Sequence, residues 1–222
     1  MITHFTIFGE RNSGTNYLQS HLSDRLYLKF TNDYGFKHWY INNIYPRGVK
    51  NTTTDNECLK SIHSNTDHVL FIIIVRNPHD WIGGMYNKPW HIKNIDKSNY
   101  YNFVSNKYIA YENNNSNRKI WNININNKYP YFIEEDENLI SLRNTKNEHF
   151  YNLKNHVQNY YLIRQEHFKQ DINDMINIFH LKTKHSKFKN YKTPTNYKLD
   201  TKTIKFIDTN LNNTIDKLYY IK

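Results

Sequence analysis

The sequence of 222 residues is poor in cysteine, in glycine and in long apolar runs. Its only cysteine, Cys58, cannot form a disulfide within the chain or contribute to a multi-cysteine metal site. The longest apolar run, Val69 to Val75, has the length of a strand, whereas a membrane span needs roughly 18 apolar residues. The N-terminal residues show no signal-peptide pattern. We therefore expect a cytoplasmic protein without a membrane span.

Apolar residues make up 38% of the chain, and the mean hydropathy of −0.87 is low for a globular protein. The 19 tyrosines and 12 phenylalanines nevertheless provide enough bulk for a core, so disorder throughout is not expected. We predict a single domain over residues 1–222. Within it, we expect an Asn-rich surface insertion at about 112–128 and a long basic loop at about 182–198.

The formal net charge is +10. A basic surface suits a phosphorylated ligand, a nucleic acid or an anionic glycan, and composition alone does not choose among them. A codon bias that produces solvated lysines would give the same charge. The sequence contains neither a helix-turn-helix pattern nor an RNA-recognition aromatic motif, so we expect no specific nucleic-acid partner.

Short apolar runs that end in polar turns alternate with helical patterns. The runs predict strands at residues 4–8, 69–75 and 160–163, with a weaker one at 35–39. The helical spacing of apolar residues predicts helices at 17–26, 103–111, 150–157, 171–179 (capped by Asp171) and 204–218. This alternation favours an α/β fold, a three-layer sandwich around a mainly parallel sheet.

The stretch "IFGERNSGTNYLQ" runs from the first strand through a turn of small residues into a helix. Gly9 and Gly14 have the spacing of a nucleotide triphosphate loop, but Thr15 stands where that loop needs its lysine. Backbone N–H groups at the start of the helix, the Ser13 and Thr15 hydroxyls and the Arg11 cation are suited to bind phosphate. The missing lysine argues against a triphosphate with Mg²⁺ and leaves a single 5′-phosphate possible.

A second stretch, "FIIIVRNPHDWIGGMY", places Arg76 at the end of a central strand, before a turn and a helix. Ligands of α/β sheets bind beyond the carboxyl ends of the strands, so an arginine there is placed to meet an anion. Taken alone, Arg76 would more often be the partner of a structural salt bridge.

The two stretches together resemble the PAPS-dependent sulfotransferase family, which transfers a sulfuryl group from 3′-phosphoadenosine 5′-phosphosulfate (PAPS). "ERNSGTNYL" is similar to its 5′-phosphosulfate loop, and "VRNPHDWIGGMY" to its 3′-phosphate segment; "SLRNTKNEHFYNLKNHV" and "YLIRQEHF" resemble a later helix and strand. The resemblance implies the P-loop-like sulfotransferase fold, PAPS as co-substrate and no metal. It assigns cofactor binding to these residues: Arg11, Asn12, Ser13, Gly14, Thr15, Asn16, Arg76 and Gly84.

Two positions depart from the family's pattern. The residue before Ser-Gly-Thr is commonly basic, whereas here it is Asn12 and the base is Arg11, one residue earlier. Gly84 stands where the family commonly has a serine that supports the arginine, so Arg76 needs another partner. These departures bear on affinity and activity more than on the fold.

The segment "GFKHWY" provides a candidate acid–base group. It resembles the strand that delivers a lysine and a histidine to the family's active site, commonly as K-x-H. We take His38 as the base for the acceptor proton and Lys37 as the group that stabilises the leaving phosphate. Adjacent residues of a strand point to opposite faces, so we expect only one of the two to reach the site unless the strand ends between them.

Other residues receive subsidiary assignments. His63, His79 and His91 are alternative bases or contacts of the ligand, and Trp90 is a candidate substrate-lining residue. Trp81 is expected to pack in the core, and Glu166, which matches the family's late glutamate, to serve structure. The stretch 182–192, "KTKHSKFKNYK", either clamps the 3′-phosphate or is a solvated loop.

The sequence therefore predicts a sulfotransferase that acts on a hydroxyl or amine of a glycan or small-molecule acceptor by in-line displacement. An alternative is a weak or inactive protein of the same fold that binds an anionic glycan or a nucleotide. A second alternative is a P-loop nucleotide kinase or NTPase. It is disfavoured because Thr15 replaces the lysine and Arg76 stands where an acidic Mg²⁺ ligand would end the strand.

Overall fold

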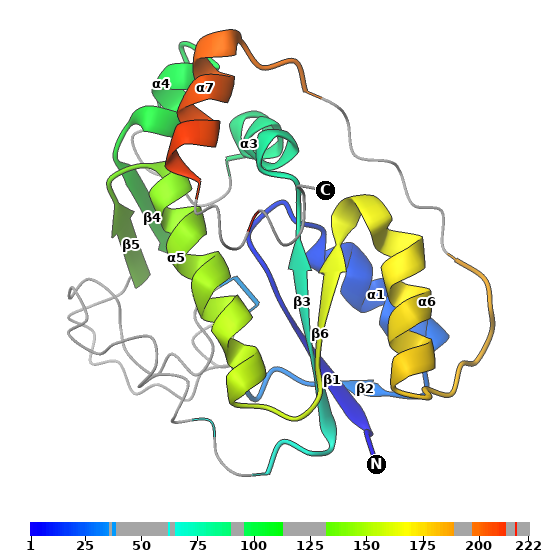
Figure 1. The fold of residues 1–222 in the computed structure, drawn as a ribbon. Helices are drawn as coiled ribbons and strands as arrows, with labels where there is room; N and C mark the ends of the chain where they lie inside the picture. Colours follow the sequence, from blue (N-terminus) through cyan, green and yellow to red (C-terminus); the bar gives the residue numbers. More distant parts are fainter. Residues whose placement is uncertain are drawn as a thin grey trace.

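The fold is α/β, with a parallel sheet flanked by helices (Figure 1). The computed structural model describes residues 1–35, 37–38, 62, 65–89, 96–112, 132–188, 197–211 and 216. Among these residues no helix is long and apolar enough to cross a membrane.

Four strands form the sheet in the order β2-β1-β3-β6. They are β1 (His4–Phe8), β2 (Lys29–Phe30), β3 (Val69–Val75) and β6 (Tyr160–Arg164). Each of the three pairings is parallel. All seven side chains of β3 are buried, as expected of an interior parallel strand that is covered on both faces. The strands predicted at 4–8, 69–75 and 160–163 are thus confirmed, and β2 was not predicted.

The chain order creates a switch point between β1 and β3. After β1, helix α1 (Thr15–Arg25) leads to β2 on one side of β1, and the chain then crosses to β3 on the other side. In open α/β sheets, ligands bind in the crevice that such a reversal leaves at the carboxyl ends of the strands. The two segments singled out in the sequence follow β1 and β3 and therefore lie at this switch point.

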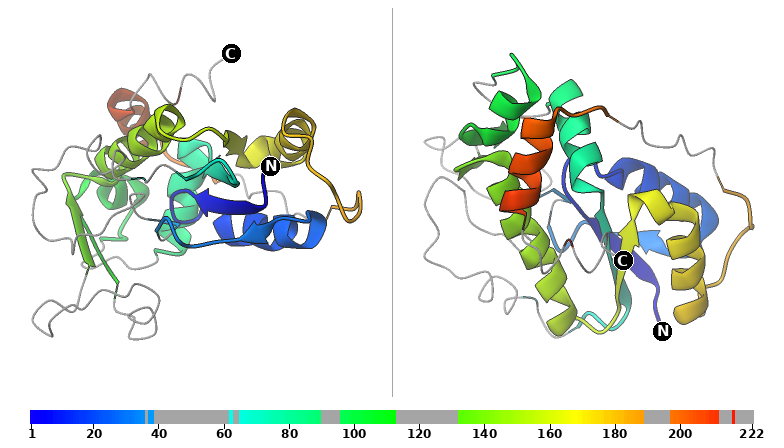
Figure 2. Two further views of the ribbon diagram at one scale, coloured as in Figure 1. Left: turned by 90° about the horizontal axis from the view of Figure 1, so that it is seen from below. Right: turned by 45° about the horizontal axis from the view of Figure 1, so that its top comes forward.

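Helices cover both faces of the sheet. Leu18, Leu22 and Leu26 of the α1 segment pack with α6 (Phe168–Ile178) against one face. On the other face, α5 (Leu139–Asn152) and the short helix η2 (Leu153–Asn155) pack Phe150 and Leu153 against the sheet. In the left view of Figure 2 the sheet lies between α5 and α1. The layered α/β arrangement agrees with the prediction from sequence.

A second cluster of buried residues lies beyond the carboxyl ends of the strands. It is formed by α3 (Pro78–Asn87), α4 (Tyr100–Ser105), α5, α7 (Thr201–Asn210) and the first residue of β4 (Tyr108–Glu112). Strand β4 pairs antiparallel with β5 (Phe132–Asp136). The predicted Asn-rich insertion falls between these two strands, and beyond Glu112 it lies outside the described residues.

The helix predicted over 103–111 is wrong in its second half. Helix α4 ends at Ser105, Asn106 has an extended backbone (φ −77°, ψ 159°), and Tyr108 begins β4. The apolar spacing fitted a helix, but pairing with β5, more than twenty residues later, gives these backbone groups their hydrogen-bond partners. Propensity is overridden here by a tertiary contact.

Three other predicted elements need correction. Helix α6 begins at Phe168, following the short helix η3 (Gln165–His167), so Asp171 is not its cap. Gly35, Lys37 and His38 belong to no strand, and the rest of the predicted strand 35–39 lies outside the described residues. Helix α7 ends at Asn210, with an extended backbone at Leu211, whereas Asp216 is helical; residues 212–215 and 217–218 of the helix predicted over 204–218 lie outside the described residues.

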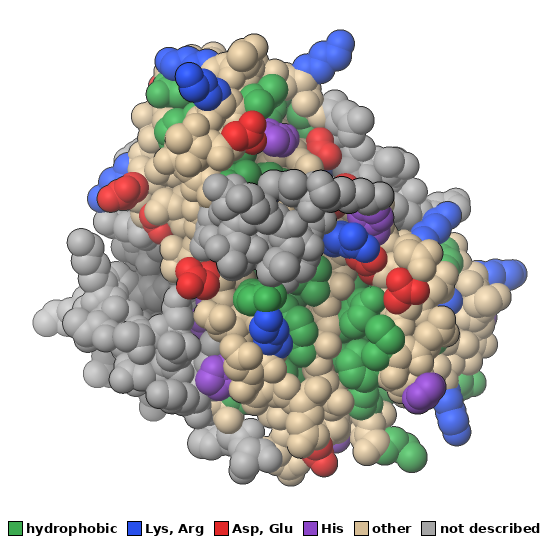
Figure 3. All heavy atoms as spheres, in the orientation of Figure 1, with side chains coloured by type: hydrophobic (Ala, Val, Ile, Leu, Met, Phe, Trp, Pro, Cys, Tyr) green, Lys and Arg blue, Asp and Glu red, His purple; other side chains and the backbone are tan. Residues whose placement is uncertain are grey.

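Positive charge is dispersed on the face shown in Figure 3. The Lys and Arg side chains of the described residues lie in several separate places on this face, and Asp and Glu side chains lie among them. On this face they form no continuous basic stripe of the kind that tracks a nucleic-acid backbone.

Candidate functional site

The loop between β1 and α1 is a tight turn held by its own backbone. The Gly9 N–H donates to the Lys37 carbonyl oxygen over 2.9 Å, and a Cβ at Gly9 would overlap the carbonyl oxygen of Ile74. The Ser13 N–H and hydroxyl both donate to the Glu10 carbonyl oxygen, over 3.1 and 2.6 Å. The predicted Ser13 hydroxyl donor is therefore engaged within the loop.

Helix α1 begins at the end of this loop without a side-chain cap. Its N-cap, Gly14, has φ 97° in the left-handed region, and no side chain caps the helix. The first turn of a helix has N–H groups without intrahelical partners and a partial positive charge. No acidic residue lies in this first turn, which starts with the buried Thr15. The start of α1 therefore remains suited to an anion.

Helix α3 and the residue after it fix the loop through hydrogen bonds. The indole N–H of the fully buried Trp81 donates to the Arg11 carbonyl oxygen over 2.6 Å. The side-chain amide of Asn12 donates to the Lys88 carbonyl oxygen over 3.1 Å and contacts the Met85 sulfur at 3.0 Å. Trp81 packs as predicted and also anchors the loop. The Asn12 side chain is directed to α3 and its vicinity, and its backbone has φ 61°.

Arg76 reaches the loop from the end of β3. One terminal nitrogen, Nη1, donates to the Asn12 carbonyl oxygen over 3.1 Å, and the residue is only 6% exposed. A Cβ at Gly84 would lie 2.8 Å from this nitrogen. The glycine that departs from the family's pattern therefore provides the space in which the guanidinium lies. The Tyr197 ring centroid lies 5.9 Å from the guanidinium carbon.

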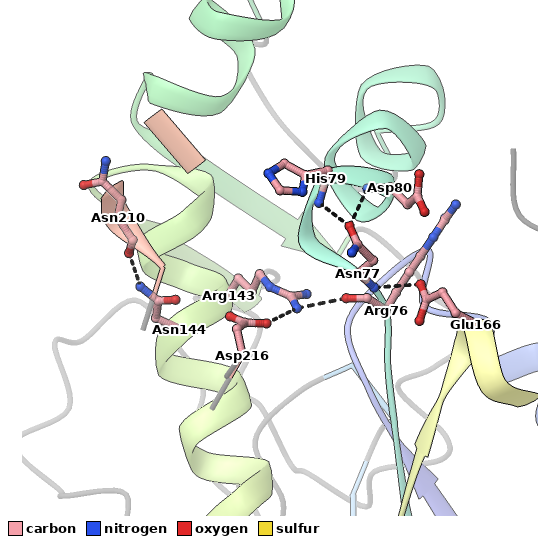
Figure 4. A network of polar contacts seen from close by, with 9 residues as sticks. All are labelled: Arg76, Asn77, His79, Asp80, Arg143, Asn144, Glu166, Asn210 and Asp216. Carbon is pink, nitrogen blue, oxygen red and sulfur yellow. Dashed lines mark hydrogen bonds and ion pairs between the residues drawn. The ribbon is translucent and has the colours of Figure 1, made fainter. Parts of the chain in front are cut away.

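The peptide group that joins Arg76 to Asn77 is fixed from two directions (Figure 4). Its carbonyl oxygen accepts from Arg143 of α5 over 2.9 Å, and its N–H donates to Glu166 over 2.7 Å. The Asn77 side chain caps α3, because its oxygen accepts from the His79 N–H over 3.0 Å. Glu166 thus has a structural contact, as its assignment from sequence anticipated.

His38 and Lys37 both contact the loop segment. The Nδ1 atom of His38 lies 2.9 Å from the Gly9 carbonyl oxygen. A carbonyl oxygen only accepts, so Nδ1 carries the proton and Nε2 is the basic nitrogen of the neutral ring. The Lys37 ammonium donates to the Asn16 side-chain oxygen. Because the two residues lie in a turn rather than in a strand, His38 reaches the loop and Lys37 the first turn of α1, contrary to the expectation for strand neighbours.

The surroundings of His38 disfavour its protonation. Burial first, and then the positive charge of Arg11, lower the pKa of His38 well below its ordinary value of 6.5. The charges of Lys37 and Lys146 lower the pKa further, against the opposing effect of the hydrogen bond to Gly9. Burial also lowers the pKa of Lys37. His38 is therefore neutral near pH 7, the state that a general base requires.

Helix α5 contributes contacts that sequence reasoning missed. Lys146, with no exposed surface, donates to the His38 carbonyl oxygen over 2.7 Å and lies 3.5 Å from a carboxylate oxygen of the buried Glu10. Arg143 and Lys146 share the helix face of Leu139 and Phe150. The sequence carried one signal for these contacts: two cations lie within an apolar stripe at helical spacing. Such cations become buried, and buried charges require specific partners.

The basic stretch that was considered as a phosphate clamp begins far from the loop. The Lys184 N–H donates to the Arg25 carbonyl oxygen over 2.7 Å, at the C-terminal end of α1. Gly14 is at the other end of this 11-residue helix, about 16 Å away. Residues 189–196 lie outside the described residues.

Of the three other histidines considered from the sequence, the structure describes one. His79 pairs with Asp208 of α7, with Nε2 2.8 Å from the carboxylate oxygen. His63, His91 and Trp90 lie outside the described residues. Within the described part of the chain, no group of three or more His, Cys, Asp or Glu side chains could hold a metal ion.

Comparisons with models of protein families, with curated proteins and with solved structures found no match to this chain.

Proposed function

We propose that this protein is a PAPS-dependent sulfotransferase with the P-loop-like sulfotransferase fold. The observation that carries the proposal is the convergence of two cations on the start of α1: Arg76 contacts the Asn12 carbonyl oxygen and Lys37 the Asn16 side chain. Asn12 and Asn16 flank the uncapped Gly14. Two cations beside a helix N-terminus suit a ligand with more than one anionic group.

The position of this convergence supports a nucleotide ligand. The loop after β1 and the segment after β3 occupy the switch point, where α/β sheets bind nucleotides. In the proposed complex the 5′-phosphosulfate lies at the start of α1, near Ser13, Gly14 and Thr15. The 3′-phosphate lies at Arg76, and Arg11 of the loop provides a second cation.

The chemical step is an in-line displacement at sulfur. The acceptor oxygen or nitrogen forms a bond to sulfur while the bond from sulfur to the 5′-phosphate oxygen breaks. The acceptor proton moves to Nε2 of His38, and 3′,5′-ADP leaves with the electron pair of the broken bond. Lys37 and the N-terminus of α1 stabilise the negative charge that develops on this phosphate. The acceptor is a hydroxyl or amine of a glycan or a small molecule.

Calorimetry with 3′,5′-ADP, ATP–Mg²⁺ and heparin tests the proposal. We expect 3′,5′-ADP to bind, and Arg76→Ala to abolish that binding. Arg164→Gln is the matched control because Arg164 ends the neighbouring strand, in register with Val75, and is paired with Asp171. Thermal unfolding of both variants verifies that they fold.

Each ligand identifies a different function. Binding of ATP–Mg²⁺ without 3′,5′-ADP would contradict the proposal and favour a P-loop kinase or NTPase. Binding of heparin alone would favour a non-catalytic protein of the same fold that binds anionic glycans. Equal loss of 3′,5′-ADP binding in Arg76→Ala and Arg164→Gln would remove the specific role of Arg76.

A further inference from the structure

Helix α5 places two buried cations side by side. Arg143 is 1% exposed and Lys146 is fully buried. Residues three apart on a helix lie on the same face, so both side chains leave α5 in similar directions. This face packs toward the carboxyl end of the sheet, where Figure 4 shows Arg143 directed from α5 to the end of β3.

Each cation ends on the backbone of a different site residue. Arg143 donates to the carbonyl oxygen of Arg76 over 2.9 Å, and Lys146 donates to that of His38 over 2.7 Å. Both also have an acidic partner: Asp216 lies 2.9 Å from Arg143, and Glu10 lies 3.5 Å from Lys146.

Building on the proposed function, we infer that α5 is the positioning element of the site, with Arg143 orienting the nucleotide-binding Arg76 and Lys146 orienting the base His38. Neither cation is required merely to fill space, because burying a charge is unfavourable unless it is paired and hydrogen-bonded. The two target carbonyls belong to separate segments: that of His38 to the turn at residues 37–38, and that of Arg76 to the segment directly after β3. One rigid helix therefore sets the distance between the cofactor-binding residue and the base.

The two contacts have separable consequences. Loss of the Arg143 contact frees the Arg76–Asn77 peptide on its carbonyl side and should weaken nucleotide binding. Loss of the Lys146 contact frees the backbone of His38 and should lower turnover with little change in nucleotide affinity. A purely structural role for α5 would instead lower stability and leave both functional properties unchanged in the folded fraction.

The charge of Lys146 provides a readout at His38 itself. The groups that act on this ring are Arg11 in the loop, the adjacent Lys37, Lys146 from α5 and the Gly9 carbonyl oxygen. Glu10 lies next to Lys146 on the same side. Replacing Lys146 by Met keeps the length of the side chain, removes one positive charge from this set and should raise the pKa of His38.

The experiment compares Arg143→Gln and Lys146→Met in the full chain. For each variant we would measure the Kd of 3′,5′-ADP, the turnover with PAPS and the titration of His38 by NMR, assigned by its absence in His38→Asn. We expect Arg143→Gln to weaken 3′,5′-ADP about tenfold with an unchanged His38 titration. We expect Lys146→Met to raise the His38 pKa and reduce turnover about tenfold, with affinity changed less than about twofold.

Conservative variants and a control complete the test. Arg143→Lys and Lys146→Arg keep a cationic donor and should restore most of each property. Thr145→Ala, on the same helix with its hydroxyl bound to the Ser141 carbonyl oxygen, should change none of them. Wild-type affinity, turnover and His38 titration in folded Arg143→Gln and Lys146→Met would overturn the inference. If the wild type binds no 3′,5′-ADP, the proposed function fails, while the His38 titration still tests the Lys146 contact.

Discussion

The imidazole of His38 donates from Nδ1 to the carbonyl oxygen of Gly9, over 2.9 Å. This hydrogen bond links the turn that carries the candidate base to the first residue of the candidate phosphate loop. It also selects the tautomer in which Nε2 is the unprotonated nitrogen of the neutral ring.

His38→Asn separates these two functions of the ring. The amide nitrogen of asparagine can replace Nδ1 as donor to Gly9, but asparagine has no basic nitrogen in place of Nε2. We expect turnover with PAPS to fall by about 10²- to 10⁴-fold while the Kd of 3′,5′-ADP stays near the wild-type value. His38→Gln is the comparison, because its amide reaches the position of Nε2 instead. Undiminished turnover in His38→Asn would remove His38 from the chemistry.

The stability of the protein should fall as the pH is lowered below 6.5. Because the folded-state pKa of His38 is depressed below its ordinary 6.5, the unfolded chain binds the extra proton in this range. The slope from one such group is at most about 1.4 kcal/mol per pH unit and ends below the folded-state pKa. Above pH 6.5 the ring is neutral in both the folded and the unfolded state, so the His38 contribution to stability no longer changes with pH. Urea unfolding between about pH 7.5 and 5 measures the slope, and His38→Asn should reduce it by this amount.

Gly84→Ala should disturb Arg76 specifically. The new Cβ would lie 2.8 Å from a terminal nitrogen of Arg76, so the guanidinium must shift away from the Asn12 carbonyl oxygen, a lost hydrogen bond of about 1 kcal/mol. In an Arg76→Ala background the clash is absent, and the same substitution should cost much less. Denaturant unfolding of the two single variants and the double variant gives the coupling. Additive effects would show that Gly84 accommodates something other than the guanidinium.

Trp81→Phe should loosen the loop with little loss of packing. Phenylalanine retains most of the buried aromatic surface but cannot donate to the Arg11 carbonyl oxygen, which accepts from Trp81 over 2.6 Å. An unpaired buried acceptor costs about 1–3 kcal/mol. We expect a lower free energy of unfolding and weaker binding of 3′,5′-ADP. Tyr86→Phe is a control on the same helix, because its hydroxyl bonds to the Lys97 carbonyl oxygen instead.

Asp216→Asn tests how the C-terminal part of the chain supports the site. Asp216 is the acidic partner of the buried Arg143, which would otherwise carry an uncompensated charge. Breaking a buried ion pair from one side costs about 3–5 kcal/mol. We expect a clear decrease in the melting temperature, followed by calorimetry. Restoration of stability by adding Arg143→Gln would show that the unpaired charge is the cause.

Some of the fold could be predicted because the signals are local. Strand β3 is a run of seven apolar residues, and only a strand covered on both faces buries all of them. The turn around Gly9 and Gly14 requires small residues, since a Cβ at Gly9 overlaps the Ile74 carbonyl oxygen. The helix after it follows from the spacing of Leu18 and Leu22. For the same reason Arg76 could be placed at the carboxyl end of a central strand.

Other features depended on partners that are distant in the chain. Tyr108 entered β4 because β5 pairs with it, although its spacing from Phe103 fitted a helix. Lys37 and His38 lie in a turn, from which His38 reaches the loop and Lys37 the first turn of α1. No local pattern distinguishes that turn from a short strand.

The sequence by itself determined the α/β class, the central parallel strands and the anion-suited turn before α1, because each depends on neighbouring residues that bury or expose one another. The tertiary structure alone decided which backbone groups of the site the buried cations of α5 contact. Arg143 and Lys146 are on one helix, yet their targets, Arg76 and His38, are on segments that only the folded sheet brings within hydrogen-bonding distance. A buried cation must find a partner, but its sequence position does not specify which carbonyl oxygen that will be.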